Sequence, residues 1–371
     1  MKKIDSLEYS TLIWFLIRAC FAEVTFTNLL YIVKQDSWIS VVIGSILGLI
    51  PLAIFEYLKQ KYPNETLITL NEKILGKFGK ILNFIILIGC LIISTCIFWI
   101  LVHFANSLFL YKTSIWIISL AFIIPIGYAS SKDIHVIGKI SLMLFYISIL
   151  FSIIITIGLT GSTDISNVKP ILESGLGKTF IGSLIFVALN TSKIFFLSII
   201  PKNKIINYSS KKSILLYIFA CLTLVQITIT TTCIFGIDLS TLYEYPAFQI
   251  LKRVNILGVL DRIESILSIE ALFSLFIQII IIIYYAKEII NSLFLPKEKT
   301  NKYVITSICL LIFIISNIVF LTHESGEKFF NSKLIYIMYI VCIFIPIITF
   351  VKSLKEIKII KNKHYNTSYN C

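Results

Sequence analysis

Runs of about 20 apolar residues recur along this 371-residue sequence, separated by short loops that carry most of its charge. A helix of that length crosses the ~30 Å hydrocarbon core of a bilayer and satisfies its own backbone hydrogen bonds there. We therefore expect an all-α polytopic membrane protein. The runs predict ten transmembrane helices, at about 11–32, 38–58, 82–110, 114–130, 137–160, 179–200, 213–236, 265–290, 303–322 and 334–351.

The charge distribution fits a membrane protein better than a nucleic-acid-binding one. Hydrophobic residues make up 57% of the chain and charged residues 14%, whereas about a quarter of the residues in soluble proteins are charged. The net charge of +13 comes from lysines scattered through short loops, without the basic stripe and interleaved aromatics of a nucleic-acid interface. We expect the lipid bilayer, and no nucleic acid, as a partner.

Most Lys and Arg residues fall on alternate loops, on the side of the membrane that holds the N-terminus. Because cytoplasmic loops carry the excess of positive charge, this pattern predicts that both termini are cytoplasmic and that 352–371 forms a basic cytoplasmic tail. No small-residue cleavage site follows the first span, so we expect this span to be retained rather than removed as a signal peptide.

Ten spans divide into two groups of five, about 11–160 and 179–351, and an odd number per group gives the two halves opposite orientations in the membrane. Transporters with such inverted repeats commonly break the corresponding helix of each half and bind substrate at the breaks, near the midplane. We therefore expect one integral-membrane, transporter-like domain over 1–371 whose first and sixth helices are broken.

The first span carries two charges, Arg18 and Glu23, near its middle. On a continuous helix this spacing places the side chains about 140° apart, so they cannot simply neutralise each other. Either each finds a partner on another helix, or the backbone over 19–22 leaves the helix and admits water or a ligand. A charge at the centre of a span costs about 2.5–3.5 kcal/mol and usually marks a site. The alternative is snorkelling to an interface, which suits Arg18 better than Glu23.

Polar groups also interrupt the sixth and eighth spans. Asn190-Thr191-Ser192-Lys193 lies in the sixth span, at the position that corresponds to the break in the first. The alternative is that the hydroxyls bond their own helix and Lys193 snorkels to the cytoplasmic side. Glu270 lies in the eighth span, where it can pair with Lys193 or Arg18 or occupy a wetter outer end of the helix. Glu264, at the start of that span, is a further ion-pair candidate.

Two loops predict local structure. Pro63, followed by polar residues, predicts a short amphipathic helix that Gly76 ends. The longest outer connection, 237–264, mixes aromatic and charged residues. We expect it to form a helix along the outer face that covers an outward-facing cavity or meets a partner.

The cysteines indicate no redox or metal chemistry. All except the terminal Cys371 lie inside apolar spans, with no CxxC pair and no metal-ligand spacing to the four histidines. We expect them to pack in the core, and we expect no cofactor and no metal.

Several stretches resemble those of the spore germination permease family, the B subunit of nutrient germinant receptors, within the amino acid/polyamine/organocation transporter superfamily. They occur in the expected order over most of the chain: Asp36-Ser37-Trp38-Ile39-Ser40, Tyr62-Pro63-Asn64-Glu65-Thr66-Leu67, Ile74-Leu75-Gly76-Lys77, Val168-Lys169-Pro170-Ile171-Leu172-Glu173-Ser174-Gly175, Tyr245-Pro246-Ala247-Phe248 and Asp261-Arg262-Ile263-Glu264-Ser265.

This resemblance implies a ten-helix fold of two inverted repeats with a pocket between the first, third, sixth and eighth helices. It also implies work in the inner membrane of a bacterial spore, beside an A subunit in the membrane and a lipoprotein C subunit, as a sensor of a small nutrient such as an amino acid. One departure is the absence of glycine before Gly44, since family members usually have glycines at the first break. A cationic or amine-bearing ligand is at least as consistent, because Glu23 attracts one.

Two functions follow as hypotheses. The first is a ligand-sensing receptor subunit, and the second is a secondary transporter of an amino acid or amine, coupled to protons or sodium through Glu23 or Glu270. An intramembrane enzyme lacks support, because no HExxH, GxSxG or paired catalytic constellation occurs. The candidate ligand-binding residues are Cys20, Ala22 and Glu23 of the first span, Asn190 and Thr191 of the sixth, and Cys96 and Trp99 of the third, with His103 a weaker choice. Arg18, Lys193, Glu264 and Glu270 are the coupling or ion-pair candidates.

Overall fold

The structure is a computed structural model that describes residues 2–159, 163–253, 263–294, 301–319, 329 and 333–355. The described chain is helical except for short loops and one pair of two-residue parallel strands, in which Ile4 lies opposite Ile205. The elements that position the site are β1 (Ile4–Asp5), α1 (Ser6–Arg18), η1 (Phe21–Thr25), α2 (Phe26–Val33), α3 (Ser37–Leu47), α4 (Leu49–Lys61), α5 (Leu67–Leu75), α6 (Lys77–Leu108), α7 (Ile115–Ser130), α8 (Ile134–Leu159), α9 (Leu176–Leu189), η5 (Thr191–Ile199), β2 (Ile205–Ile206), α10 (Ser210–Leu242), α11 (Pro246–Gln249), η7 (Ile250–Arg253), α12 (Ile263–Phe294), α13 (Asn301–Val319) and α15 (Ile335–Tyr339).

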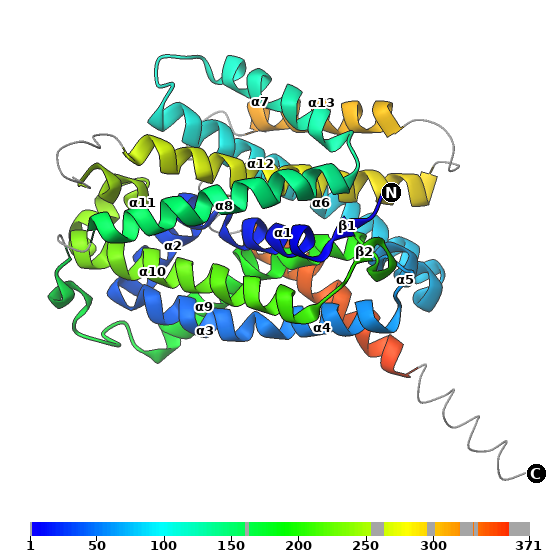
Figure 1. Ribbon diagram of the computed structural model, residues 1–371, viewed down its shortest axis with the longest axis horizontal. Helices are drawn as coiled ribbons and strands as arrows, with labels where there is room; N and C mark the ends of the chain where they lie inside the picture. Colours follow the sequence, from blue (N-terminus) through cyan, green and yellow to red (C-terminus); the bar gives the residue numbers. More distant parts are fainter. Residues whose placement is uncertain are drawn as a thin grey trace, which may run out of the picture.

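Within these residues, seven helical segments are long and apolar enough to cross a membrane, and two shorter apolar helices accompany them. The first of the seven, Ser6–Lys61, takes in α1 to α4, which run to one end of the molecule and return (Figure 1). The chain is therefore an all-α polytopic membrane protein, as the sequence predicts. The count of ten spans and the division into two inverted repeats stay predictions.

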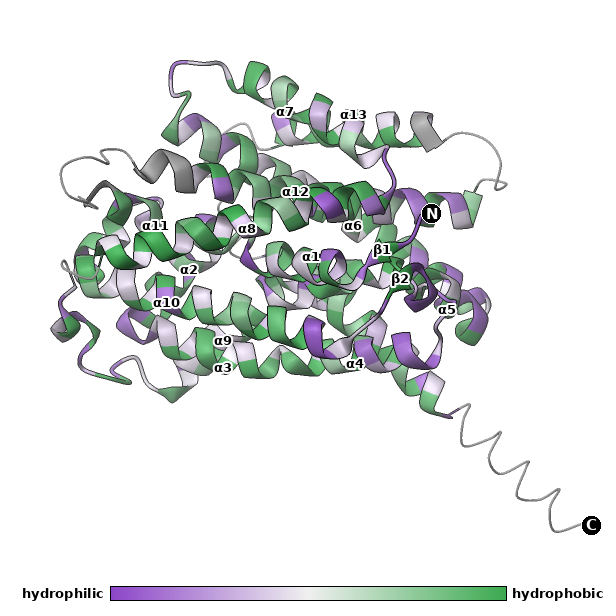
Figure 2. Ribbon diagram, in the orientation of Figure 1, coloured by the Kyte–Doolittle hydropathy of each residue, from purple (hydrophilic) through white to green (hydrophobic). Residues whose placement is uncertain are grey.

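The long helices lie side by side, and the outer layer of the bundle is apolar. Hydrophobic residues dominate the helices, whereas hydrophilic ones gather toward the helix ends and loops (Figure 2). On α7, which packs with α13 at one edge of the molecule, Ile117 and Ile124 are 62% and 63% exposed. Such a surface is expensive in water but suits contact with lipid chains.

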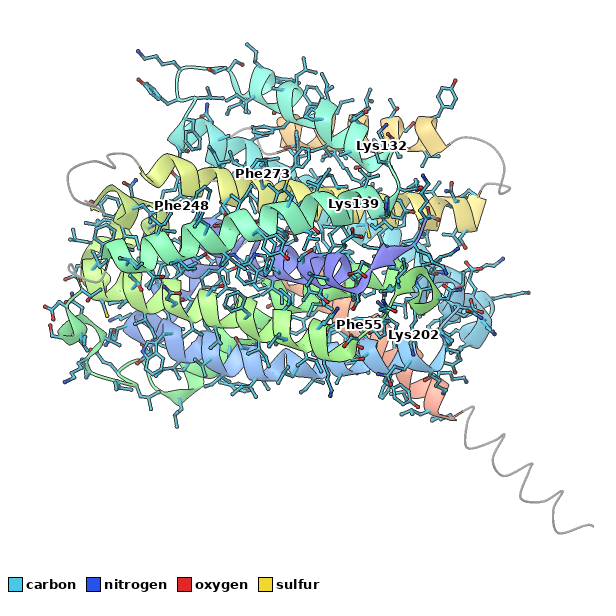
Figure 3. All side chains as sticks on the ribbon, viewed as in Figure 1. Phe55, Lys132, Lys139, Lys202, Phe248 and Phe273 are labelled. Atoms are coloured by element: carbon cyan, nitrogen blue, oxygen red, sulfur yellow. The ribbon has the colours of Figure 1, made fainter. Side chains whose placement is uncertain are left out.

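Three lysines that the sequence assigns to the cytoplasmic side lie toward one end of the molecule (Figure 3). Lys132, Lys139 and Lys202 lie toward the end that holds the N-terminus, whereas Phe248 lies toward the opposite end (Figure 3). This arrangement agrees with the loop assignment made from the sequence. The orientation of the chain in the membrane stays a prediction.

The first helix forms the centre of the bundle, because α1 packs against α8, α10, α12 and η5. The side chains from Leu12 to Ile17 are fully buried. Its start is fixed by a capping box, in which the Asp5 carboxylate accepts from the Leu7 amide at 2.9 Å and the Glu8 carboxylate accepts from the Asp5 amide at 3.1 Å. The strand pair joins this start to the segment that follows η5. The N-terminal half of the first span is therefore held from several sides.

The loop after the second span contains a short helix close to its predicted position. Thr66 caps the start of α5, and Gly76 ends it with a φ of 57°, which glycine adopts without strain. Asn71 donates to Asn83 at 2.9 Å, and both side chains are buried. This polar pair fixes α5 against the start of α6.

Candidate functional site

The first transmembrane helix is interrupted where the sequence predicts a break. α1 ends at Arg18, Cys20 adopts a left-handed conformation with a φ of 64°, and the chain resumes as the single π turn η1 before α2. A non-glycine residue in this conformation costs roughly 1–2 kcal/mol. The break therefore forms without the glycine that the related family usually has, and neighbouring contacts have to offset its strain.

Those contacts come from the sixth span, which is also irregular. α9 ends at Leu189, and the chain continues beyond Asn190 as the 3₁₀ helix η5. The amide of Asn190 donates to the Ile17 carbonyl at 2.8 Å, and the Lys193 ammonium donates to the Ala19 carbonyl at 2.5 Å. The C-terminal carbonyls of α1 lack partners within their own helix, so these two side chains satisfy them.

The alternative considered for this stretch is correct for the hydroxyls and wrong for the lysine. Thr191 donates to the Val187 carbonyl at 3.3 Å and Ser192 to the Ala188 carbonyl at 2.6 Å, so both bond back to the residue four positions earlier in the same span. Lys193, however, is only 2% exposed and points to the break. It does not snorkel, because the unpaired carbonyls of α1 offer its charge a nearer partner.

Arg18 forms an ion pair with the eighth span. Its Nη2 lies 2.9 Å from Glu270 Oε1, its Nη1 donates to Thr223 Oγ1 of α10 at 2.7 Å, and its guanidinium lies 4.7 Å from the centroid of the Trp14 ring. Of the two pairings considered for Glu270, the structure contains the one with Arg18. Removing either partner of such a buried pair typically costs about 3–5 kcal/mol, because it leaves the other charge uncompensated.

Glu23 forms no such ion pair with the residues that the structure describes. Its side chain lies on η1, beyond the break, and is 5% exposed. Glu23 Oε2 has no hydrogen-bond partner among the described residues. A buried acceptor without a partner is expensive, so it usually has an ion, water or ligand to meet.

Glu23 faces a cavity with an empty volume of about 830 Å³, counting its open mouth. We call it the Glu23 cavity. Arg18, Ala22, Glu23 and Glu270 line it, together with residues of α8, α10, α11 and η7. Polar side chains of α10 recur on this side at helical spacing, at Thr223, Gln226 and Thr230. A cavity with apolar walls and a few convergent polar groups is the usual form of a small-molecule site.

A second, smaller cavity lies on the other side of the break. This Cys20 cavity has an empty volume of about 290 Å³ and is lined by Cys20, Lys193 and Gln278 among apolar residues of η1, α6, α9 and the last span. Lys193 Nζ lies 3.4 Å from Gln278 Oε1, and Cys20 Sγ lies 3.6 Å from the same atom. The helices that the family resemblance implies around a pocket surround this cavity.

The structure thus divides the candidate residues among several places. Ala22, Glu23, Arg18 and Glu270 share the Glu23 cavity, while Cys20 and Lys193 line the other. Asn190 and Thr191 are buried but line neither cavity, because Asn190 donates to the backbone at the break and Thr191 to the preceding turn.

The candidates of the third span do not line either of these two cavities. This span contributes Ile93 and Ile97 to the Cys20 cavity in place of the buried Cys96. The rings of Trp99 and His103 lie 4.5 Å apart in a tilted arrangement, and both residues line a separate cavity with Asn317. The side chain of Glu264 lies outside the described residues.

Three stretches quoted for the family resemblance have structural roles at the predicted outer end. The Asp36 carboxylate accepts from the Leu172 amide at 2.7 Å and the Ser174 amide at 3.1 Å, so two stretches far apart in sequence meet. The third stretch contributes Ala247 and Phe248, which line the Glu23 cavity. The described part of the outer connection therefore lines a cavity, in agreement with one of the two predictions for it, and the outward-facing direction of that cavity stays a prediction. Residues 254–262, including Arg262, lie outside the description.

Comparisons with known proteins point to one family. The profile described as spore germination protein matches residues 8–325. The chain is similar to spore germination protein YndE of Bacillus subtilis (strain 168), with 24% identity over 272 residues that cover 71% of this chain and 73% of the relative. It is also similar to spore germination protein KB of the same strain, with 21% identity over 273 residues that cover 72% of this chain and 73% of that protein.

Proposed function

Because this chain belongs to the spore germination protein family, we propose that it is the membrane-embedded, transporter-like subunit of a nutrient germinant receptor. In this proposal it lies in the inner membrane of a bacterial spore with both termini cytoplasmic. Its partners are the A subunit in the membrane and the lipoprotein C subunit. It binds a small nutrient, an amino acid or an amine, and binding triggers germination.

One observation carries the choice of site. Glu23 lines a cavity of about 830 Å³, and its buried Oε2 has no hydrogen-bond partner among the described residues. A polar ligand group that meets this oxygen gains a charge-assisted hydrogen bond in a largely apolar surrounding. This favours the Glu23 cavity as the nutrient site over the smaller Cys20 cavity.

The broken helix offers a way for binding to change the protein. Arg18 is the last residue of α1, and Glu23 lies on η1 beyond the break, yet both line the same cavity. A nutrient in this cavity contacts both halves of the helix, so its binding free energy depends on how they are arranged. A ligand that binds one arrangement more tightly shifts the population toward it. We propose that this shift is the signal passed to the partner subunits.

A secondary transporter of an amino acid or amine, coupled to protons or sodium, is the second candidate. The observation that favours it is the presence of two buried carboxylates, Glu23 and Glu270, beside a cavity at a helix break. The two candidates share the cavity and differ in flux. Uptake of the nutrient by the isolated protein supports the transporter, whereas a requirement for partner subunits supports the receptor.

The experiment that tests the receptor role is germination of spores that lack only this protein. The spores are exposed to single amino acids, amines and nucleosides, and release of dipicolinic acid is measured. We expect loss of the response to one nutrient class, restored by the intact gene. An unchanged response to every nutrient contradicts the proposal and directs attention to uptake assays with the purified protein.

A further inference from the structure

We infer that the Glu23 cavity selects a ligand with one positive charge and an apolar body, a primary amine, over the zwitterionic amino acid with the same side chain. This inference rests on the proposed function, since it names the ligand chemistry of the same cavity. The sequence leaves amino acid and amine open. The contacts of the charged residues around the cavity distinguish them.

The positively charged side chain that lines the cavity, Arg18, is already paired with a carboxylate of the protein. Arg18 donates to Glu270 at 2.9 Å and to Thr223 at 2.7 Å, and Trp14 lies against its guanidinium. These two contacts use two of the five N–H groups of the guanidinium, but its charge is paired with Glu270, so a ligand carboxylate competes with Glu270 for that charge. Displacing Glu270 leaves a second buried carboxylate without a counter-ion, which is costly in a membrane interior.

The other buried cation near the break, Lys193, also has a protein partner, and it does not line the Glu23 cavity. Lys193 donates to the Ala19 carbonyl at 2.5 Å and lines the Cys20 cavity rather than the Glu23 cavity. The remaining charged group at the Glu23 cavity is Glu23 itself, with a buried oxygen that no described residue meets. What the described lining offers a ligand is therefore a negative charge.

The rest of the lining defines the body of the ligand. Ile155 and Leu159 of α8, Ile227 of α10, and Phe248 and Leu251 of the outer connection present apolar surface to the cavity. Thr156 and Gln226, which also line it, hydrogen-bond to each other. An ammonium group at Glu23 with an apolar chain against these residues satisfies the unpaired oxygen and leaves the Arg18 contacts intact.

Matched ligands test this inference on the purified full-length protein in lipid nanodiscs. Affinities are measured by ligand-induced thermal stabilisation for three pairs with the same side chain: isobutylamine and valine, 3-methylbutylamine and leucine, and phenethylamine and phenylalanine. The alcohol 3-methylbutan-1-ol controls for the apolar body alone. We expect at least one amine to bind about tenfold or more tightly than its amino acid and than the alcohol.

Two variants sharpen the result. Glu23→Gln keeps the shape of the side chain and removes its charge, so we expect it to lower amine affinity about tenfold or more while alcohol binding stays the same. The matched control is Glu288→Gln on α12, which removes a partly exposed carboxylate that pairs with Lys287. Glu288 lies 18 residues beyond Glu270, about 27 Å along the helix. We expect this control to bind amines like the unchanged protein.

The outcomes separate the inference from the proposal on which it rests. Amino acids that bind as tightly as their amines, with affinity lost in Ala271→Phe, which fills the cavity, overturn the preference for an amine and leave the cavity as the nutrient site. Amine binding that Glu23→Gln leaves unchanged also overturns the inference. Failure of every pair to stabilise the unchanged protein counts against both statements.

Discussion

The two cavities beside the broken first helix differ in what they leave unpaired. In the Cys20 cavity, the Lys193 charge is held by the Ala19 carbonyl, and the group without a partner among the described residues is neutral, the Nε2 amide of Gln278. In the Glu23 cavity, Arg18 and Glu270 neutralise each other, and a carboxylate oxygen of Glu23 remains without a partner. One break in the helix can therefore serve two purposes. In the Cys20 cavity, the charge of Lys193 holds the unwound backbone, and in the Glu23 cavity, the carboxylate of Glu23 is available to a ligand.

The largest effect we expect is on the ligand side. Glu23→Gln should remove the germination response, because it removes the charge of a buried carboxylate whose Oε2 has no hydrogen-bond partner among the described residues, while the protein still reaches the membrane. Release of dipicolinic acid and membrane protein level are measured together, with Glu288→Gln as the control. A normal response at a normal protein level contradicts the need for this carboxylate.

A substitution in the Cys20 cavity should lower the stability of the protein rather than change its choice of ligand. Lys193→Met keeps the length of the side chain but leaves the Ala19 carbonyl with only the longer contact from Asn190 Nδ2, at 3.5 Å, and loss of a donor to a buried acceptor costs about 1–3 kcal/mol. We expect a lower unfolding midpoint in detergent and an unchanged preference among ligands. Loss of ligand binding without loss of stability reverses the roles assigned to the two cavities.

The cover of the Glu23 cavity should affect signalling more than binding. Pro246 begins α11, whose next two residues line the cavity, and its ring fixes φ there. Pro246→Ala should raise the nutrient concentration needed for half-maximal germination several-fold, with a much smaller change in nutrient affinity. We expect the same of a change at Arg262. Binding and response that fall in step refute this role.

The smallest effect concerns selectivity. Thr223→Val removes the oxygen that accepts from Arg18 Nη1 at nearly unchanged volume. The released donor then becomes available to a ligand carboxylate, so the affinity for amino acids should rise a few-fold relative to that for amines. Titration of leucine and 3-methylbutylamine against the variant measures this ratio. An unchanged ratio indicates that the contact with Thr223 does not help to exclude a carboxylate.

The all-α membrane architecture and the break in the first helix follow from local features of the sequence. Apolar run length predicts spanning helices, and two charges that cannot meet on one helix face, Arg18 and Glu23, indicate either partners on other helices or an interruption between them. The structure contains the interruption, and it also contains a partner for Arg18 on another helix. These features depend on few distant contacts. The short helix before Gly76 and the irregular backbone at Asn190 are predictable for the same reason.

The composition of the cavities was harder to predict, because it depends on which helix faces meet. The sequence groups Cys20 with Glu23, yet the left-handed turn at Cys20 sends the two side chains to different cavities. Thr223 and Gln278 were missed, although each is a polar residue inside an apolar span and that signal was available. The contribution of α8 and α10 to the lining of the Glu23 cavity was missed as well. The helical spacing of Thr223, Gln226 and Thr230 in the sequence could have indicated it for α10.

Labelling of two cysteines by a small membrane-permeant thiol reagent tests the central claim most directly. One is the native Cys20, which lines the small cavity, and the other is introduced by Thr230→Cys, which lines the Glu23 cavity. Mass spectrometry of the purified variant, with and without the nutrient that triggers germination, measures the rate at each position. We predict that the nutrient slows labelling at position 230 and leaves Cys20 unchanged. Protection of Cys20 without protection at position 230 places the nutrient in the small cavity and contradicts the account.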